Sequence, residues 1–320
     1  MTFTDFIVIS FFRQTSGNWS WWPSWRPTSM SLLKSAEAKI LSCKILTSFA
    51  HLNMPPSLST GAQTPLVMIH GFGGGVGLWI RNLDALSHSR PVYAVDLLGF
   101  GRSSRPLFPS DALLAEEQFV TSIEQWRQSL GLERMILLGH SLGGYLATSY
   151  TIQYPERYLK KSLVLAKSFV DDTSKSSYSR HHHVTCVHAG PGLVNRFRPD
   201  FKRKFEDLFE DDTMMQYIYH CNAQNPSGEV GFKAMSESIG WAKRPMVQRV
   251  HLLPPSIPTS VTVRNYCVCN AGHSLNSLVG NIKNDSSFSL QLIEDASHHV
   301  YADQPEEFNR VVESICNTVD

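Results

Sequence analysis

The stretch Met135-Ile136-Leu137-Leu138-Gly139-His140-Ser141-Leu142-Gly143-Gly144 decides the fold that we expect for this chain. Its apolar beginning is typical of a buried strand, and it runs directly into Gly-x-Ser-x-Gly and then into a helical pattern. In a nucleophile elbow the serine lies on a strained strand-to-helix turn, and the glycines on either side allow close backbone approach. The pattern predicts Ser141 as a catalytic nucleophile at the carboxyl edge of a mostly parallel sheet, with a purely structural turn as the alternative.

A glycine-rich segment follows a second predicted strand at residues 65–69. The segment His70-Gly71-Phe72-Gly73-Gly74-Gly75 matches the oxyanion loops in which bare backbone N–H groups reach a developing negative charge. We expect the N–H groups of Phe72 and Leu142 to be the donors. A phosphate-binding loop is the alternative, but the chain has neither a Gly-Lys-Ser/Thr ending nor a Gly-x-Gly-x-x-Gly followed by a ribose-binding acid. A nucleotide site is therefore not expected.

Two further strand-like runs complete the pattern. Residues 91–95 stop in a glycine-rich turn at Asp96, which we interpret as a turn-capping carboxylate and not as a catalytic acid. Residues 289–293 alternate as a strand, and a loop containing His298 and His299 then leads into a terminal helix. A nucleophile followed later in the chain by a histidine is the order of this type of hydrolase, so position selects one of these two histidines as the base.

Several longer motifs together resemble one subfamily of vertebrate α/β-hydrolases. That subfamily contains the lipase that acts on N-acylphosphatidylethanolamines and its paralogue, the lipid-droplet co-activator of triglyceride lipase. The motifs are the oxyanion loop, Asp-Leu-Leu-Gly-Phe-Gly-Arg-Ser-Ser-Arg-Pro, Gly-His-Ser-Leu-Gly-Gly, Arg-Pro-Asp-Phe-Lys-Arg-Lys-Phe (198–205), Tyr-Ile-Tyr-His-Cys-Asn (217–222) and His-Val-Tyr-Ala-Asp-Gln-Pro. Because the co-activator has asparagine at the nucleophile position, Ser141 makes this chain more similar to the lipase branch.

The resemblance implies an α/β-hydrolase fold, which is a mostly parallel sheet with helices on both faces and an inserted cap. It implies His298 as the catalytic histidine, and a serine hydrolase that acts on phospholipid acyl esters without a metal or organic cofactor. The pattern His298-x-x-x-x-Asp303 is the one from which acyltransferase activity has been suggested for the family. Transfer of an acyl group to lysophosphatidic acid is therefore one alternative, and a catalytically impaired lipid-droplet adaptor is another.

The chain departs from the family where the acid of the triad should lie. Relatives carry an aspartate shortly after the penultimate strand, here residues 257–263, whereas this chain has Asn270 near that position. No Asp or Glu occurs from Ser238 to Asn284, and an asparagine cannot stabilise an imidazolium as a carboxylate does. Asp285 and Asp303 are the substitutes that we consider.

Composition sets the domain organisation and the partners. With 320 residues, 42% hydrophobic and 18% charged, the chain can form an N-terminal arm and helix (1–60) and a hydrolase domain (61–320) with a cap at about 166–254. A net charge of +1 gives no general attraction to nucleic acid. The Cys residues lack a Cys-x-x-Cys pair, which favours a reducing compartment.

The N-terminal arm is rich in tryptophan, a residue that favours the membrane–water boundary. Prolines and an arginine are interleaved with the four residues Trp19, Trp21, Trp22 and Trp25. Packing of these rings on the domain itself is the alternative to docking on a lipid surface. We expect a cytoplasmic protein on membranes or lipid droplets, with phospholipid as substrate and lipid-droplet coat proteins as possible partners, and we keep the mitochondrion open as a second location.

Overall fold

The computed structural model describes residues 28–42, 63–157, 199–237, 242–254, 259–264 and 288–318. Its strands are β1 (Leu66–Ile69), β2 (Val92–Val95), β3 (Ile136–Gly139), β4 (Thr259–Arg264) and β5 (Phe288–Ile293). Its helices are α2 (Met30–Ser42), α3 (Leu83–Ser87), α4 (Ala112–Ser129), α5 (Leu142–Gln153), α9 (Pro199–Phe205), α10 (Thr213–Asn222), α11 (Gly228–Met235), α14 (Val300–Asp303) and α15 (Pro305–Cys316). The strands that the sequence predicts are all present within about two residues of their expected positions.

The described strands form two parallel sheets. The first has the order β2-β1-β3, and Leu66 of β1 is in register with Val92 of β2 and with Ile136 of β3. The second pairs β4 with β5. Because all described strand pairs are parallel, the carboxyl ends of β1, β2 and β3 lie at one edge, where ligand sites form in open α/β sheets. The expectation of a mostly parallel sheet is confirmed.

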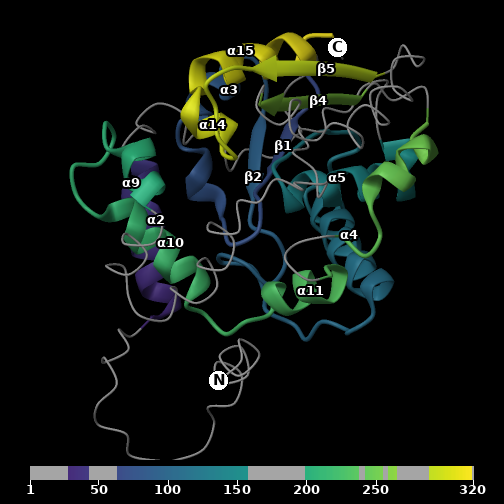
Figure 1. Cartoon of the computed structure of the whole chain (residues 1–320), viewed down its shortest axis with the longest axis horizontal. Helices are drawn as coiled ribbons and strands as arrows, with labels where there is room; N and C mark the ends of the chain where they lie inside the picture. The colour runs from purple at the N-terminus through teal and green to yellow at the C-terminus, as the bar shows by residue number, and fades with distance from the viewer. Residues whose placement is uncertain are drawn as a thin grey trace, which may run out of the picture.

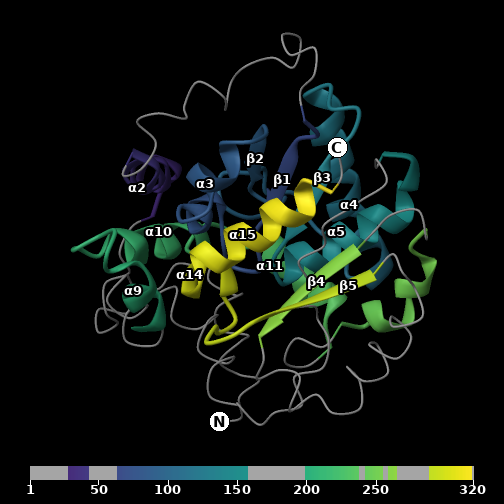
Figure 2. The ribbon, with the colours of Figure 1, turned by 90° about the horizontal axis from the view of Figure 1, so that it is seen from above.

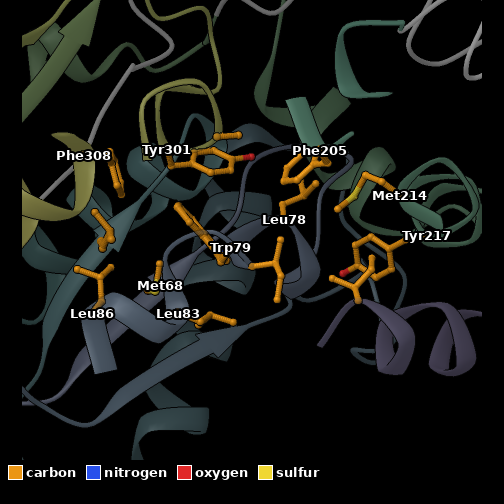
Figure 3. Packing of buried hydrophobic residues seen from close by; sticks show 14 of the residues in the cluster. Met68, Leu78, Trp79, Leu83, Leu86, Phe205, Met214, Tyr217, Tyr301 and Phe308 are labelled. Atoms are coloured by element: carbon orange, nitrogen blue, oxygen red, sulfur yellow. The ribbon is translucent and has the colours of Figure 1, made fainter. Parts of the chain in front are cut away.

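Strand β1 is buried on both faces, and its alternation divides the core in two. Leu66 and Met68 belong to a cluster that includes α3 and α15, whereas Val67 and Ile69 belong to one that includes α4 and α5. Figure 3 shows the first cluster, in which Trp79 lies beside Met68, Tyr301 and Phe308. Helices therefore cover both faces of the sheet, as Figure 2 shows from above.

Helix α4 begins earlier than its apolar pattern suggests. The sequence predicts a helix from about Glu116 to Leu130, but the helix spans Ala112–Ser129. Asp111 is its N-cap, and the Asp111 carboxylate accepts a hydrogen bond from the N–H of Leu114 at 3.0 Å. This cap satisfies one of the orphan N–H groups of the first turn and so extends the helix in the N-terminal direction.

The N-terminal helix packs with the cap helices, at the left of Figure 1. The sequence predicts a helix at about Ser31 to Leu46, and the structure has α2 at Met30–Ser42, packed against α10. Its buried Glu37 carboxylate pairs with Arg102 at 2.6 Å, in the turn that follows β2.

The four tryptophans of the arm lie outside the described residues, as does much of the cap, and the predicted domain boundaries stay predictions. None of the described helices combines the length and apolar character that crossing a membrane requires.

Candidate active site

Ser141 lies on a strained turn between β3 and α5. Its φ of 54° and ψ of −117° fall where non-glycine residues are uncommon, and such strain is typical of functional positions. The glycines on either side are needed for packing: a Cβ on Gly139 would lie 2.4 Å from the carbonyl oxygen of Gly143, and one on Gly143 would lie 2.3 Å from that of Ile69. The predicted elbow is therefore present, and it brings the start of α5 onto the end of β1.

The glycine-rich segment 70–75, the predicted oxyanion loop, lies directly beside this elbow. A Cβ on Gly71 would lie 3.1 Å from the Cβ of Ser141, so the loop passes the nucleophile in close contact. Leu142 is the first residue of α5, and its N–H donates to no acceptor among the described residues. A free N–H at a helix N-terminus is suited to stabilise negative charge. Phe72 follows Gly71 in the loop, and its ring packs against Phe232 with ring centroids 4.4 Å apart.

A neutral histidine fixes the beginning of the oxyanion loop. His70 is buried, and its Nε2 accepts a hydrogen bond from the N–H of Leu97 at 3.0 Å, so this nitrogen carries no proton. The proton belongs on Nδ1, which lies 2.7 Å from the carbonyl oxygen of Gly71. Burial lowers the pKa of His70, which keeps the ring neutral.

Asp96 caps the turns next to this histidine, in agreement with its interpretation from sequence. Its carboxylate oxygens accept from the N–H of Val76 at 2.9 Å and from the N–H of Arg102 at 2.8 Å. Gly101 has a φ of 48°, and a Cβ there would lie 2.3 Å from the carboxylate carbon of Asp96. The carboxylate therefore joins the loop after β1 to the loop after β2.

Helix α10 of the cap holds the same loop from the other side. Asn222 donates to the carbonyl oxygen of Gly73 at 2.7 Å, and the hydroxyl of Tyr217 accepts from the N–H of Gly77 at 2.9 Å. Both side chains are buried. Local sequence patterns did not identify these two supports of the loop, although both belong to the 217–222 motif that carried part of the family resemblance.

The histidine loop lies beside the elbow. His298 follows β5, and its backbone carbonyl oxygen is 2.8 Å from Nε2 of His140, the residue before the nucleophile. The ring centroid of His140 lies 4.7 Å from that of His298 and 5.3 Å from that of His299. His299 is buried and packs against Phe201, whereas His298 is half-buried. The structure thus brings the elbow and the predicted histidines together, and the choice of His298 as base stays a prediction.

The structure describes one of the two carboxylates that we consider as substitutes for the triad acid. Asp285 and Asn270 lie outside the described residues. The carboxylate of Asp303 accepts from the N–H and the hydroxyl of Ser297 and pairs with Lys204, and none of its hydrogen bonds with described residues is to His298. Asp303 therefore has other partners than the one that a triad acid requires. Within the same part of the chain, no three His, Cys, Asp or Glu side chains are grouped as metal ligands.

The chain is similar to known hydrolases and to one acyltransferase. The alpha/beta hydrolase fold family matches residues 64–236. A (lyso)-N-acylphosphatidylethanolamine lipase from Mus musculus is 52% identical, covering 92% of this chain and 94% of the relative, and the Homo sapiens protein of that name is 50% identical with the same coverage. The 1-acylglycerol-3-phosphate O-acyltransferase ABHD5 of Rattus norvegicus is 47% identical, covering 92% of this chain and 91% of the relative.

Solved structures show the same fold at low identity. The carboxylesterase CesB from Bacillus subtilis has a TM-score of 0.64 at 19% identity, over 89% of this chain and 97% of that one. The naproxen esterase from Bacillus subtilis also has a TM-score of 0.64, at 18% identity over 90% and 99%. The elbow, the oxyanion loop and these similarities lead to one conclusion: the chain belongs to the α/β-hydrolase fold family.

Proposed function

We propose that the protein is a serine hydrolase of phospholipid acyl esters, with (lyso)-N-acylphosphatidylethanolamine as the substrate class. The observation that carries this proposal is the strained Ser141 between the oxyanion loop and the His298 loop. The head-group assignment comes from the lipases that are 50–52% identical to this chain.

The arrangement supports a two-step acyl transfer. His298 removes the proton of Ser141, whose Oγ attacks the ester carbonyl carbon, and the N–H groups of Phe72 and Leu142 bind the tetrahedral oxyanion. The intermediate collapses as His298 donates the proton to the leaving lysolipid oxygen. Water, deprotonated by the same histidine, then attacks the acyl carbon, and the bond from that carbon to Oγ of Ser141 breaks. His298 returns the proton to Oγ as the fatty acid leaves.

The acyltransferase is the second candidate function, because a relative with that name is 47% identical. It would use the same acyl-enzyme, with the hydroxyl of lysophosphatidic acid as the acceptor in place of water. A His298–Asp303 dyad is not favoured as its catalytic unit, because the Asp303 carboxylate is bonded to Ser297 and Lys204. Formation of labelled phosphatidic acid from labelled lysophosphatidic acid and an acyl donor separates this reaction from hydrolysis.

We also propose peripheral attachment to a membrane or a lipid droplet, on the cytoplasmic side, through the tryptophan-rich arm. Four tryptophans within seven residues, interleaved with proline and arginine, support this proposal. Coat proteins of lipid droplets are the partners that such a location would provide. Vesicle co-sedimentation of the wild type and of a variant with Trp19, Trp21, Trp22 and Trp25 changed to Ala tests the attachment.

The first experiment is covalent labelling of the purified protein with a fluorophosphonate probe. We expect Ser141→Ala and His298→Ala to abolish labelling, and His251→Ala, at an exposed histidine away from the described site, to leave it unchanged. The His299→Ala variant shows whether His298 or its neighbour is the base, because loss of the base abolishes labelling. If the folded wild type is not labelled, the hydrolase proposal is wrong, and a non-catalytic adaptor that has lost its triad acid becomes the better account.

A further inference from the structure

Three side chains meet immediately before His298. The carboxylate of Asp303 in α14 accepts from the N–H of Ser297 at 2.7 Å and from its hydroxyl at 2.5 Å. Lys204 in α9 of the cap donates to the same hydroxyl at 2.7 Å and forms an ion pair with Asp303. We call this group the Lys204–Asp303–Ser297 clamp. The hydroxyl of Ser297 thus accepts from Lys204 and donates to Asp303, so it connects the two charged groups.

The clamp is largely shielded from water. The side chain of Lys204 is 8% exposed and that of Asp303 is 14% exposed. Charges in such surroundings are weakly screened, and removal of one partner leaves the other charge uncompensated. The clamp is therefore a fixed connection between the cap and the histidine loop, unlike an exposed ion pair that opens readily.

The cap end of the clamp is itself held by the core. The carbonyl oxygen of Lys204 accepts from Nε of Arg81 at 3.0 Å and from a terminal nitrogen of the same guanidinium at 2.6 Å. Arg81 also pairs with Asp207 and lies over the ring of Phe205, 5.5 Å from its centroid. Both the backbone and the side chain of Lys204 are thus fixed.

The backbone is held on both sides of the His298 side chain. Asp303 holds the N–H of Ser297, and His140 lies 2.8 Å from the carbonyl oxygen of His298. The side chain of His298 is half-buried, and its ring centroid lies 4.7 Å from that of His140. A small displacement of this backbone would move the imidazole relative to Ser141.

We propose that Lys204 and Asp303 are positioning residues, which act through Ser297 to hold His298 in the orientation that deprotonates Ser141. This inference rests on the proposed function, since it assigns a role to residues around the same site. In this role Asp303 is neither the triad acid nor a proton carrier, because Lys204 balances the charge of the Asp303 carboxylate. It also gives the cap helix α9 a role in positioning the predicted base.

The test compares Lys204→Met with Lys204→Arg, which keeps the charge, and with Lys39→Met. Lys39 is a matched control because it also pairs with an aspartate, Asp211, but its side chain is 59% exposed. The rate of fluorophosphonate labelling at Ser141 is measured across the pH range around the ordinary pKa of histidine. We expect Lys204→Met to slow labelling roughly 10- to 100-fold. We expect its pH midpoint to rise, because the unpaired Asp303 carboxylate favours the imidazolium.

With a lipid ester as substrate, the Lys204→Met defect should fall on kcat more than on KM, Lys204→Arg should recover most of the rate, and Lys39→Met should behave like wild type. If Lys204→Met labels like Lys39→Met at every pH while the wild type is active, the positioning role is wrong and the proposed function stands. If Lys204→Met does not fold, Ser297→Ala replaces it and should show a smaller loss with little change in midpoint, because Lys204 still pairs with Asp303.

Hydrogen exchange gives a readout that does not depend on activity. The amides of Ser297 to Val300 should exchange faster in Lys204→Met than in Lys39→Met, even if the wild type is not labelled at all. Equal protection of this segment in the two variants would overturn the proposal. An inactive wild type would separately overturn the proposed function.

Discussion

Nε2 of His140 lies 2.8 Å from the carbonyl oxygen of His298, so the residue before the predicted nucleophile holds the backbone of the predicted base. His140 is buried, and its backbone N–H donates to the carbonyl oxygen of Ile69 at 3.0 Å. The end of β1, the elbow after β3 and the loop after β5 are therefore joined through one residue, by its backbone N–H and by its side chain.

Removal of this side chain should misplace the base without removing it. We expect His140→Leu to slow fluorophosphonate labelling of Ser141 roughly 10- to 100-fold, since small misplacements of catalytic groups have effects of this size. His140→Gln, which keeps an N–H donor, should retain more of the rate. Equal rates for the Leu and Gln variants would mean that the hydrogen bond to His298 has no catalytic role.

The amide of Asn222 supports the oxyanion loop from the cap. It donates to the carbonyl oxygens of Gly73 at 2.7 Å and Ile218 at 2.8 Å, and both bonds are buried. We expect Asn222→Leu to reduce kcat and to destabilise the fold by about 1–3 kcal/mol, because two carbonyl groups lose a donor. Gln224→Ala, just beyond the same helix, is the control. A kcat loss no larger than that of the control would argue against support of the loop by Asn222.

Local patterns were sufficient to predict the sheet and the elbow. The run before Gly139 is apolar and short, and Ser141 follows two residues later. Gly139 and Gly143 complete the motif, and in the structure a Cβ on either one would meet backbone atoms. The apolar pattern does not predict the start of α4, because its first apolar positions come later than the N-cap residue. In that case Asp111, three residues before its hydrogen-bond partner Leu114, was the available signal.

The connections between the cap and the catalytic loops could not be predicted in this way. Asn222 is 149 residues from Gly73, and Lys204 is 99 residues from Asp303. Such pairs depend on how α9 and α10 pack on the sheet, and no periodicity in either segment contains that information. In the sequence Lys204 lies among charges of both signs, a pattern that is typical of a solvated helix and gives no indication of a buried ion pair.

The close contact of α5 with β1 gives a prediction about stability. A Cβ on Gly143 would lie 2.3 Å from the carbonyl oxygen of Ile69 and 2.5 Å from that of His70, and backbone atoms cannot move aside easily. We expect Gly143→Ala to lower the free energy of unfolding by about 1–3 kcal/mol, measured in urea, and to abolish labelling. Gly131→Ala is the control for backbone strain alone, because Gly131 has a φ of 65° and a Cβ there would have no atom within 4 Å. It should cost about 1–2 kcal/mol and leave labelling intact.

The buried carboxylate of Glu124 should make stability depend on acid pH. Arg127 donates to both of its oxygens, at 2.8 and 2.7 Å, and Gln128 and the hydroxyl of Tyr150 also donate to it. These bonds, that of Arg127 foremost, lower the pKa of Glu124 from 4.5 to about 2. A carboxyl whose pKa is depressed on folding stabilises the protein above its unfolded pKa, and this contribution is lost as the pH falls through the folded value.

The free energy of unfolding of the wild type should therefore fall by about 3 kcal/mol between pH 4.5 and pH 2 on account of this group. Glu124→Gln should be less stable at neutral pH, because it leaves the buried guanidinium of Arg127 without a counter-ion, and the difference from wild type should shrink over the same pH range. Glu307→Gln, in an exposed pair with Arg310, should change the pH profile little. A constant difference between wild type and Glu124→Gln from neutral pH to pH 2 would show that the Arg127 pair does not depress the pKa of Glu124.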